Sequence, residues 1–447
     1  MVRYVIGVLF FCLLISGFSQ KQVAEVELPS PVIKNISGIV CGDSVLFTYY
    51  RNELYKSAAF NAVWIYPDGS QKRINLKELS GKLLIGVVHT KDSIQYYFLE
   101  EAKKKIELGM LTYHRYTNQK GAHSDRITLP GKLLGCYIER NLFLIYATKE
   151  GSAVTLLEIN NLTIVQQQKF NDAFDWEKLK TMRSTFIDSR FPMRNSQLIT
   201  PLRLIREDSA IFIVADDPAT TETASQPAFK TYISKLDLKT KTSDSKIFFE
   251  PSRADFRTVV KDNKVFRFVS RKDPELSIYD FESRTLLSKS VFEEKEKREY
   301  YIRWGIKNEI KKMELKSWSP FHSFITVDTS PSGYVLTLGG YAEEDPNVPF
   351  IGMFGLLPAA ISALANAAVH DLNDGPMAYN YYYLEVAKNF SSCKVITKTG
   401  LLKQRIDDYE LSLTPKMVYK SYIDGPQVSY AFYLTKGSSK LLIMKFE

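Results

Sequence analysis

The chain has 447 residues, of which 45% are hydrophobic, 13% aromatic and 24% charged, and it carries a formal net charge of +9 at pH 7. This composition is that of a folded globular protein and excludes a disordered or low-complexity chain. The positive charge is spread along the sequence, so it biases the protein toward anionic partners in general and argues against a nucleic-acid partner.

The N-terminus has the pattern of a cleavable signal peptide. Arg3 precedes an apolar run from Tyr4 to Ile15, and small residues follow at Gly17 and Ser19. The alternative is a membrane anchor, but the run is shorter than the roughly 20 residues that span a bilayer. We therefore predict a signal peptide over residues 1–19 and an exported protein, periplasmic, outer-membrane-associated or extracellular.

Cysteine usage predicts neither a disulfide scaffold nor a metal site. Removal of the signal peptide leaves Cys41, Cys136 and Cys393, three thiols scattered through a long chain. No CxxC or Cys/His spacing suggests zinc. We predict no metal and no cofactor, and the pairing of the three thiols stays open.

One strand pattern recurs seven times along the chain. A short polar turn is followed each time by a strand of alternating apolar residues, and the copies begin at Asp43, Asp92, Arg140, Asp208, Asn263, Ser332 and Pro426. A second element follows in most units, an apolar strand, a turn and another strand, at residues 64–70, 157–163, 236–242, 279–285 and 384–388. The Pro, Asp, Asn and Gly residues of these turns suit hairpins.

Together the two elements predict an all-β protein made of four-stranded antiparallel units, each about 45 to 50 residues long, the length of a propeller blade. The pattern resembles the β-propeller superfold with about seven blades, near residues 31–79, 81–130, 131–170, 197–250, 254–291, 320–398 and from 405 onward. Six or eight blades, or two stacked sandwiches, are the alternatives. No WD or kelch signature is present, so the resemblance identifies no functional residues.

The last predicted unit is one strand short. It ends with the apolar strand at residues 440–446, and no chain remains for a fourth strand. The segment at residues 23–28 alternates apolar and charged side chains ahead of the first unit. We predict that it pairs with the last unit and closes the propeller, which removes an open sheet edge.

The long insertions are predicted to share one face of a single domain spanning residues 20–447. In an antiparallel four-stranded blade, the second-to-third loop and the connection to the next blade lie at the same end. The long segments 171–196, 216–228, 291–319 and 341–378 all belong to this set. Long loops on a rigid scaffold commonly carry function, so this face is where binding is expected.

The most unusual insertion is an uncharged stretch at residues 350–369. It predicts a short helix from Ala359 to His370, preceded by Pro358, inserted in the sixth blade. Such a helix either covers the channel as a lid or docks a hydrophobic partner or a membrane surface. The candidate docking residues are Phe350, Ile351, Met353, Phe354, Leu356, Leu357, Ile361 and Leu364.

Aromatic and acidic residues mark the other insertions. The Glu-to-Lys spacing after residue 291 predicts a solvated helix, with Trp304 and Trp318 as candidate contacts for a sugar or a protein. The acidic pairs Asp216–Asp217 and Glu343–Glu344 are the only candidates for the two carboxylates of a glycoside hydrolase. No nucleophile motif or phosphate loop is present, and no catalytic residue is identified.

These observations favour a non-catalytic binding or scaffold protein of the cell envelope or exterior, with a protein or glycan partner. Contact with a membrane surface through residues 350–369 is a further expectation. The alternative is a carbohydrate-active hydrolase or lyase with acidic residues at the channel mouth. A hydrolase needs carboxylates about 5 to 10 Å apart around a pocket, whereas a scaffold is expected to have a filled channel.

Overall fold

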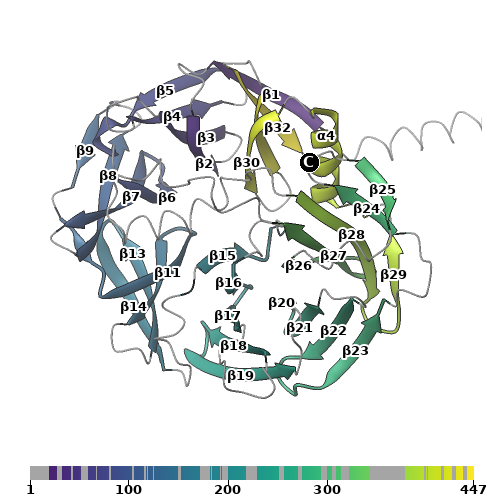
Figure 1. The fold of residues 1–447 in the computed structure, drawn as a ribbon. Helices are drawn as coiled ribbons and strands as arrows, with labels where there is room; N and C mark the ends of the chain where they lie inside the picture. Colours follow the sequence, from purple (N-terminus) through teal and green to yellow (C-terminus); the bar gives the residue numbers. More distant parts are fainter. Residues whose placement is uncertain are drawn as a thin grey trace, which may run out of the picture. The chain divides into compact units, whose positions relative to one another are not determined.

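The structure is a computed structural model that describes residues 20–446 with gaps, the longest at 52–58, 172–181, 194–199, 218–228, 293–299, 314–321 and 343–377. The chain divides into two compact units. Unit 1 consists of residues 1–77 and 400–447, and unit 2 of residues 78–399. Figure 1 labels the helices and strands of both.

Unit 1 contains two antiparallel sheets of four strands. The first is built from consecutive strands, β2 (Ile33–Cys41), β3 (Ser44–Arg51), β4 (Ala59–Ile65) and β5 (Gln71–Asn75), and is followed by the 3-10 helix η1 (Lys77–Leu79). The second has the order β1-β32-β31-β30 and contains β1 (Gln20–Glu27), β30 (Met417–Asp424), β31 (Ser429–Thr435) and β32 (Lys440–Phe446).

The pairing of the first strand with the last confirms the prediction for residues 23–28. β1 runs antiparallel to β32, with Val26 opposite Leu441 and Gln20 opposite Phe446. Ala24 and Val26 point into a core that also contains Val45 of β3 and Phe432 of β31. The N-terminal strand is therefore held by the hydrogen bonds of one sheet and by apolar packing against the other.

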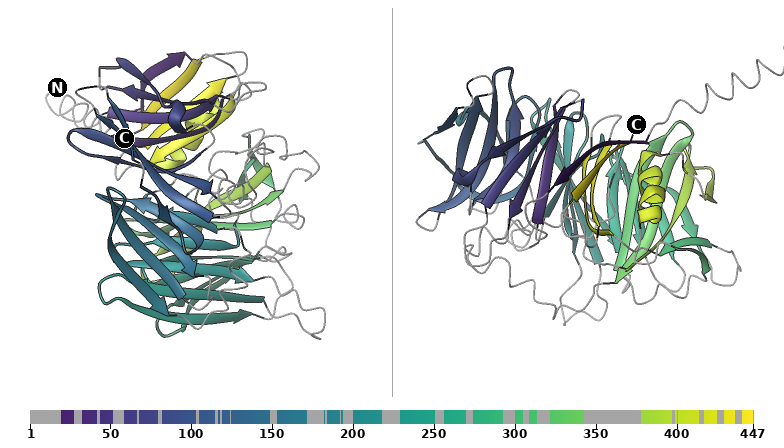
Figure 2. Two further views of the ribbon diagram at one scale, coloured as in Figure 1. Left: turned by 90° about the vertical axis from the view of Figure 1, so that its left-hand side faces the viewer. Right: turned by 90° about the horizontal axis from the view of Figure 1, so that it is seen from above.

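A helix that the sequence did not predict completes unit 1. α4 (Leu402–Leu413) precedes β30 and lies against β31 and β32 (Figure 2). Its fully buried Ile406 packs among Ala431, Tyr433 and Phe446. The sequence predicts a blade that begins near residue 405 and does not predict α4, because the apolar residues of this short helix show only weak helical spacing.

Unit 2 begins with two sheets that follow the predicted repeat. The first has the order β10-β8-β7-β6, with β9 also paired to β8, and contains β6 (Leu83–His89), β7 (Ser93–Ala102), β8 (Lys105–His114), β9 (Lys120–Ala122) and β10 (Ile127–Thr128). The next is a plain meander of β11 (Gly131–Ile138), β12 (Leu142–Thr148), β13 (Ala153–Asn160) and β14 (Thr163–Asn171).

The third sheet of unit 2 carries an additional strand. β15 (Ser184–Asp188) runs parallel to β16 and precedes the antiparallel meander of β16 (Leu202–Arg206), β17 (Ala210–Asp217), β18 (Phe229–Asp237) and β19 (Thr242–Glu250). Figure 1 shows these five strands in order. The fourth sheet is again a meander, β20 (Phe256–Lys261), β21 (Lys264–Val269), β22 (Glu275–Asp280) and β23 (Leu286–Val291).

The fifth sheet of unit 2 has six strands. Its order is β25-β24-β28-β27-β26, with β29 also paired to β28, and it contains β24 (Tyr300–Trp304), β25 (Glu309–Met313), β26 (His322–Ser330), β27 (Gly333–Ala342), β28 (Ala378–Ala387) and β29 (Cys393–Ile396). The charged stretch at residues 293–299, on which the solvated helix was predicted, lies outside the described residues. Tyr300–Trp304 forms a strand that pairs with β25 on one side and β28 on the other.

The chain has a β-propeller fold, with almost no helix among the residues that the structure describes. Its described strands form seven sheets but six blades, so the predicted count of seven blades is one too high. The sheets of β15–β19 and β24–β29 contain additional strands beyond the predicted four-stranded repeat. In unit 2 neighbouring sheets touch through β6 and β11, β11 and β15, β17 and β20, and β20 and β26. Apolar cores fill the space between the sheets.

Tight hairpin turns set the register of the sheets. Asp262 and Asn263 both adopt positive φ, of 52° and 54°, between β20 and β21. Asn161 and Leu162 do the same between β13 and β14, with φ of 48° and 59°. Two successive positive φ angles are typical of the turns whose twist matches that of a β-hairpin. Each of the seven polar turns predicted from the sequence precedes the second strand of a three-strand meander.

Candidate functional site

Most of the residues predicted for binding lie outside the described residues. This holds for the apolar stretch from Phe350 to Leu364, for Trp318, and for Glu343 and Glu344. Trp304 is the last residue of β24, opposite Glu309 of β25 and Asn380 of β28. Asp217 ends β17 opposite Lys230. Of the acidic candidates, only Asp216 has a described side chain.

Asp216 is buried in an ion pair rather than exposed at a loop tip. Its side chain is 2% exposed and that of its partner, Arg203 of β16, is fully buried. The Arg203 guanidinium donates to Asp216 Oδ2, and its second amino group donates to the carbonyl of Thr200 at 2.7 Å. A carboxylate held in this way is a structural anion, because its charge is already neutralised and its lone pairs are occupied.

Two threonines complete this buried ion-pair cluster, which we define as Thr200, Arg203, Asp216, Thr231 and Thr258. The Thr231 hydroxyl donates to Asp216 Oδ1 at 2.9 Å, and the Thr258 backbone N–H donates to Oδ2 at 3.1 Å. The two threonine hydroxyls lie 3.1 Å apart. Thr258 belongs to β20, so the cluster joins two neighbouring sheets.

The connection between β14 and β16 contains an inner segment, which we define as Met182, residues 184–191 and Met193. It includes β15, which follows β16 in parallel. Lys132 of β11 donates to the carbonyl of Met182 at 2.8 Å, and Lys261 of β20 donates to that of Ser189 at 2.7 Å. The backbone N–H of Met193 donates to Asp328 of β26 at 3.3 Å.

The inner segment is thus bound to four consecutive sheets of unit 2. Its apolar residues take part as well, because Ile187 and Met193 are buried in the core shared by the last three sheets of this unit. Part of the insertion predicted at 171–196 therefore packs along the inner strands β11, β16, β20 and β26. It is a structural part of the unit rather than a free loop.

An aromatic and ionic cluster lies at the opposite end of the same sheets, next to the short turns. Tyr137 of β11 stacks on Phe143 at 4.7 Å and on Phe186 at 5.4 Å between ring centroids. The Arg206 guanidinium lies 4.3 Å from the Tyr137 ring and bridges Glu139 and Asp188. Burial raises the pKa of Tyr137 to about 12, because the phenolate is disfavoured away from water.

The same cluster reaches solvent through Arg190. This guanidinium makes two parallel bonds to Asp188, at 2.8 and 2.6 Å, and its side chain is 37% exposed. The bonds to Asp188 raise the pKa of Arg190 further above its ordinary value. Glu139 and Asp188 are thus both paired with arginines.

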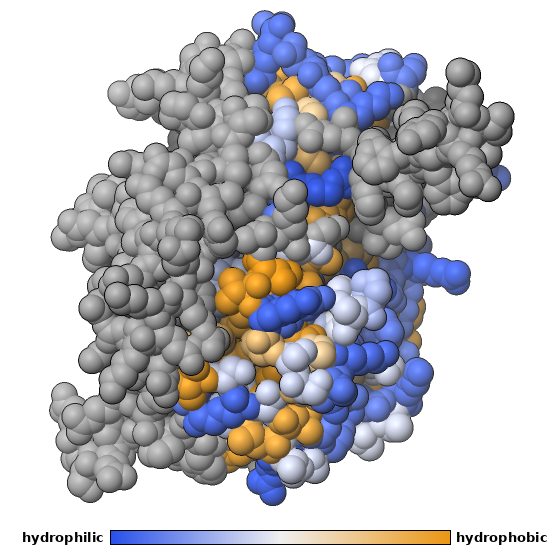
Figure 3. Space-filling view, turned by 90° about the vertical axis from the view of Figure 1, so that its right-hand side faces the viewer, coloured by the Kyte–Doolittle hydropathy of each residue, from blue (hydrophilic) through white to orange (hydrophobic). Residues whose placement is uncertain are grey.

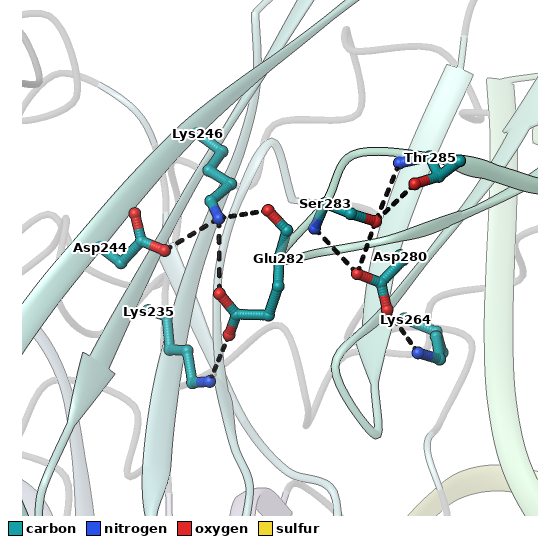
Figure 4. A network of polar contacts seen from close by, with 8 residues as sticks. All are labelled: Lys235, Asp244, Lys246, Lys264, Asp280, Glu282, Ser283 and Thr285. Atoms are coloured by element: carbon teal, nitrogen blue, oxygen red, sulfur yellow. Dashed lines mark hydrogen bonds and ion pairs between the residues drawn. The ribbon is translucent and has the colours of Figure 1, made fainter.

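A third polar network joins the sheets of β15–β19 and β20–β23 through their outer turns (Figure 4). Glu282 accepts bonds from Lys235 at 2.8 Å and from Lys246 at 3.4 Å, and Lys246 also pairs with Asp244. On the same turn, Asp280 accepts from Lys264 at 2.6 Å and from Ser283 at 2.9 Å. The Lys264 and Ser283 bonds lower the pKa of Asp280 far below its ordinary range.

Exposed apolar side chains concentrate on two outer strands. They are Ile164 and Val165 on β14, and Leu286, Leu287 and Val291 on β23, each 38% to 52% exposed. Figure 3 shows apolar patches separated by hydrophilic side chains on the side of the molecule where β23 and β29 lie. Apolar side chains that are exposed singly or in small groups are common on protein surfaces and do not by themselves indicate a binding site.

Within the described part of the chain, no group of three or more His, Cys, Asp or Glu side chains could hold a metal ion. No helix among the same residues has the length and hydropathy to cross a bilayer. The thiols of Cys136 and Cys393 are both free, and burial raises the pKa of Cys136 to about 12. A thiol with this pKa is not a nucleophile near neutral pH.

Sequence reasoning missed the arginines. Arg203 and Arg206 alternate with apolar residues in a strand that reads as half-exposed, although both are buried. Their spacing of three residues places them on opposite faces of β16, each facing an acidic partner outside that strand. Those partners, Asp216 and Glu139, are distant in sequence, so the pairs became visible only in the fold.

Comparison with known proteins finds similarity of fold only. No protein-family model matches the sequence, and neither does any curated protein. The β-propeller domain of the Trilobed protease from Pyrococcus furiosus is 9% identical, with 92% of this chain and 95% of that chain covered and a TM-score of 0.38. BamB from Moraxella catarrhalis is 10% identical over 96% of this chain and 100% of that chain, with a TM-score of 0.34.

The C-terminal WD40 domain of Sif2 is also similar, at 10% identity over 94% of this chain and 84% of that chain, with a TM-score of 0.37. At these identities and TM-scores, the similarity carries no argument about residues or activity. The functional reading therefore depends on the described geometry of unit 2.

Proposed function

We propose that this chain is a non-catalytic binding protein of the cell envelope or exterior, and that it presents the loop-bearing end of unit 2 to a protein partner. That end is defined by the second-to-third-strand connections 218–228 and 343–377 and by the connections that enter β15, β20 and β26. Long connections presented by a sheet scaffold are the usual place for recognition.

The observation that carries the proposal is the inner segment. It binds β11, β16, β20 and β26 and buries Ile187 and Met193, so side chains and backbone pack along the inner strands of these sheets, where a scaffold is expected to have a filled channel. Asp216, the one acidic candidate whose side chain is described, is neutralised by Arg203. Both features support a scaffold over a carbohydrate-active enzyme.

A matched set of variants tests this function. The full-length chain would be produced in its source cells and crosslinked in place, and its crosslinked peptides identified by mass spectrometry. One variant replaces 218–228 with a four-residue polar turn, and another replaces 348–372 in the same way. The control carries Lys241→Asn and Arg284→Asn at the opposite end, where φ of about 60° suits asparagine.

We expect one defined protein to be crosslinked to the wild type and to the control, and to be lost from at least one loop variant. A partner retained equally by all four proteins would contradict the proposal. Hydrolysis or binding of a polysaccharide by the purified wild type, abolished by either loop replacement, would favour the carbohydrate-active alternative.

Export is a separate part of the proposal and has its own test. The predicted cleavage site after Ser19 directly precedes Gln20, the first residue of β1. N-terminal sequencing of protein from the exported fraction is expected to begin at Gln20. An intact Met1 in that fraction would contradict the signal-peptide prediction.

A further inference from the structure

One buried carboxylate joins four strand ends at the loop-bearing end of unit 2. Asp216 lies one residue before the end of β17, where the connection 218–228 begins. Its Oδ1 accepts from Thr231 near the start of β18, where that connection returns. Its Oδ2 accepts from Arg203 at the start of β16 and from the backbone of Thr258 at the start of β20.

Arg203 connects the carboxylate to one more segment, the connection that enters β16. Arg203 also donates to the carbonyl of Thr200, the last part of the connection that enters β16. The end of the connection into β16, both ends of the connection 218–228 and the end of the connection into β20 are thereby fixed to a single anion. Bonds to a buried charge are stronger than neutral ones, and the group is costly to leave without its partners.

We propose that Asp216 is a positioning residue that holds the loop-bearing ends of the sheets β15–β19 and β20–β23 in one fixed arrangement. The partner then meets a pre-organised surface spanning both sheets, which lowers the ordering cost of binding. This binding role rests on the proposed function, whereas the positioning role does not depend on a partner.

The Thr258 amide makes the positioning role measurable. Its N–H donates to a side chain in a different sheet, so its protection from hydrogen exchange depends on Asp216. Asp216→Asn keeps the size of the side chain but removes the negative charge to which Arg203 and the Thr258 N–H donate. We expect exchange at Thr258, and in peptides covering residues 201–204 and 229–232, to rise by at least about tenfold.

The matched control is Asp237→Asn. Asp237 is the last residue of β18, the strand that carries Thr231 near its start. Its exposed carboxylate accepts from the backbone N–H groups of Lys239 and Thr240, each at 2.8 Å. We expect this variant to leave exchange at Thr258 unchanged. A uniform rise throughout unit 2 in Asp216→Asn, or no rise at Thr258, would overturn the positioning role.

A second variant separates positioning from stability. Arg203→Met with Asp216→Leu removes both charges and fills the space with apolar side chains, which commonly restores stability after loss of a buried pair. We expect its unfolding midpoint to return toward that of the wild type while exchange at Thr258 stays raised. Wild-type protection at Thr258 in this double variant would overturn the inference.

The crosslinking experiment tests the binding role with the same variant. If the wild type captures its partner, we expect Asp216→Asn to capture several-fold less, because the surface is no longer fixed before binding. Equal capture by the two proteins would overturn the binding role. Absence of any partner from the wild type would instead overturn the proposed function, and the exchange result would stand.

Discussion

Arg203 and Arg206 show how the chemistry of this chain depends on buried cations. They lie on opposite faces of β16, one facing Asp216 and the other Glu139 and Asp188. Arg203 is fully buried, and Arg206 is 5% exposed. Such pairs contribute little net stability compared with apolar packing, but the loss of one partner leaves an unpaired charge in the interior.

Arg203→Met is therefore expected to be more damaging than the loss of an exposed arginine. The Asp216 carboxylate would remain buried without its cation, which costs about 3–5 kcal/mol of unfolding free energy. Urea unfolding followed by circular dichroism measures the effect. Arg190→Met, which removes a 37% exposed guanidinium, serves as the comparison and is expected to cost much less. Equal losses would show that burial does not determine the cost.

Tyr137 gives the protein a predictable sensitivity to alkali. Its pKa is raised from 10.0 to about 12 by burial, so the unfolded chain releases the phenol proton first as the pH rises. The contribution to stability is complete below pH 10 and is lost between pH 10 and about 12, by up to about 3 kcal/mol. We expect Tyr137→Phe to flatten this part of the stability profile, measured by urea unfolding. Parallel profiles for the two proteins would contradict the assignment.

At the scale of single elements, the repeated hairpins were predictable and the irregular strands were not. A polar turn followed by alternating residues is a local signal, and all seven copies precede the second strand of a meander. β15 carries no such signal, because its five residues are held by a parallel partner that begins 18 residues later. α4 and the β24–β25 hairpin likewise depend on their packing against distant strands.

β1 offers the most direct test of an element. Val26 is fully buried between the two sheets of unit 1, whereas the neighbouring Glu25 faces solvent and pairs with Lys440 at 3.1 Å. Val26→Asp places a charge in that core and is expected to cost roughly 3 kcal/mol or more. Glu25→Ala removes an exposed ion pair and is expected to cost less than about 1 kcal/mol. Similar losses in thermal unfolding would mean that β1 is not packed as described.

At the scale of the molecule, the division into two compact units predicts where such damage is felt. Unit 1 combines residues from both ends of the chain, and unit 2 is continuous. Hydrogen exchange in Val26→Asp is expected to rise in β1–β5 and β30–β32 and to stay near wild-type values in β12, β13 and β17. An equal rise in both units would show that the protein opens as a single cooperative whole.

The propeller class could be predicted because its repeat is local, while the candidate site could not. The predicted blade count was one too high, and the additional strands β15, β24 and β25 were not predicted. Asp216 was singled out as an exposed acid because it precedes a polar loop. Its burial depends on Arg203, Thr231 and Thr258, which three different strands bring to it.

The pairing of β1 with β32 also fixes an order of events during synthesis. Glu25 of β1 and Lys440 of β32 are 415 positions apart. β1 therefore cannot pair in its sheet until β32 has been synthesised. A chain that stops before Lys440 lacks the strand to which both β1 and β31 bind, and it leaves two sheet edges open. We therefore expect chains that stop before β32 to be exposed to aggregation and proteolysis.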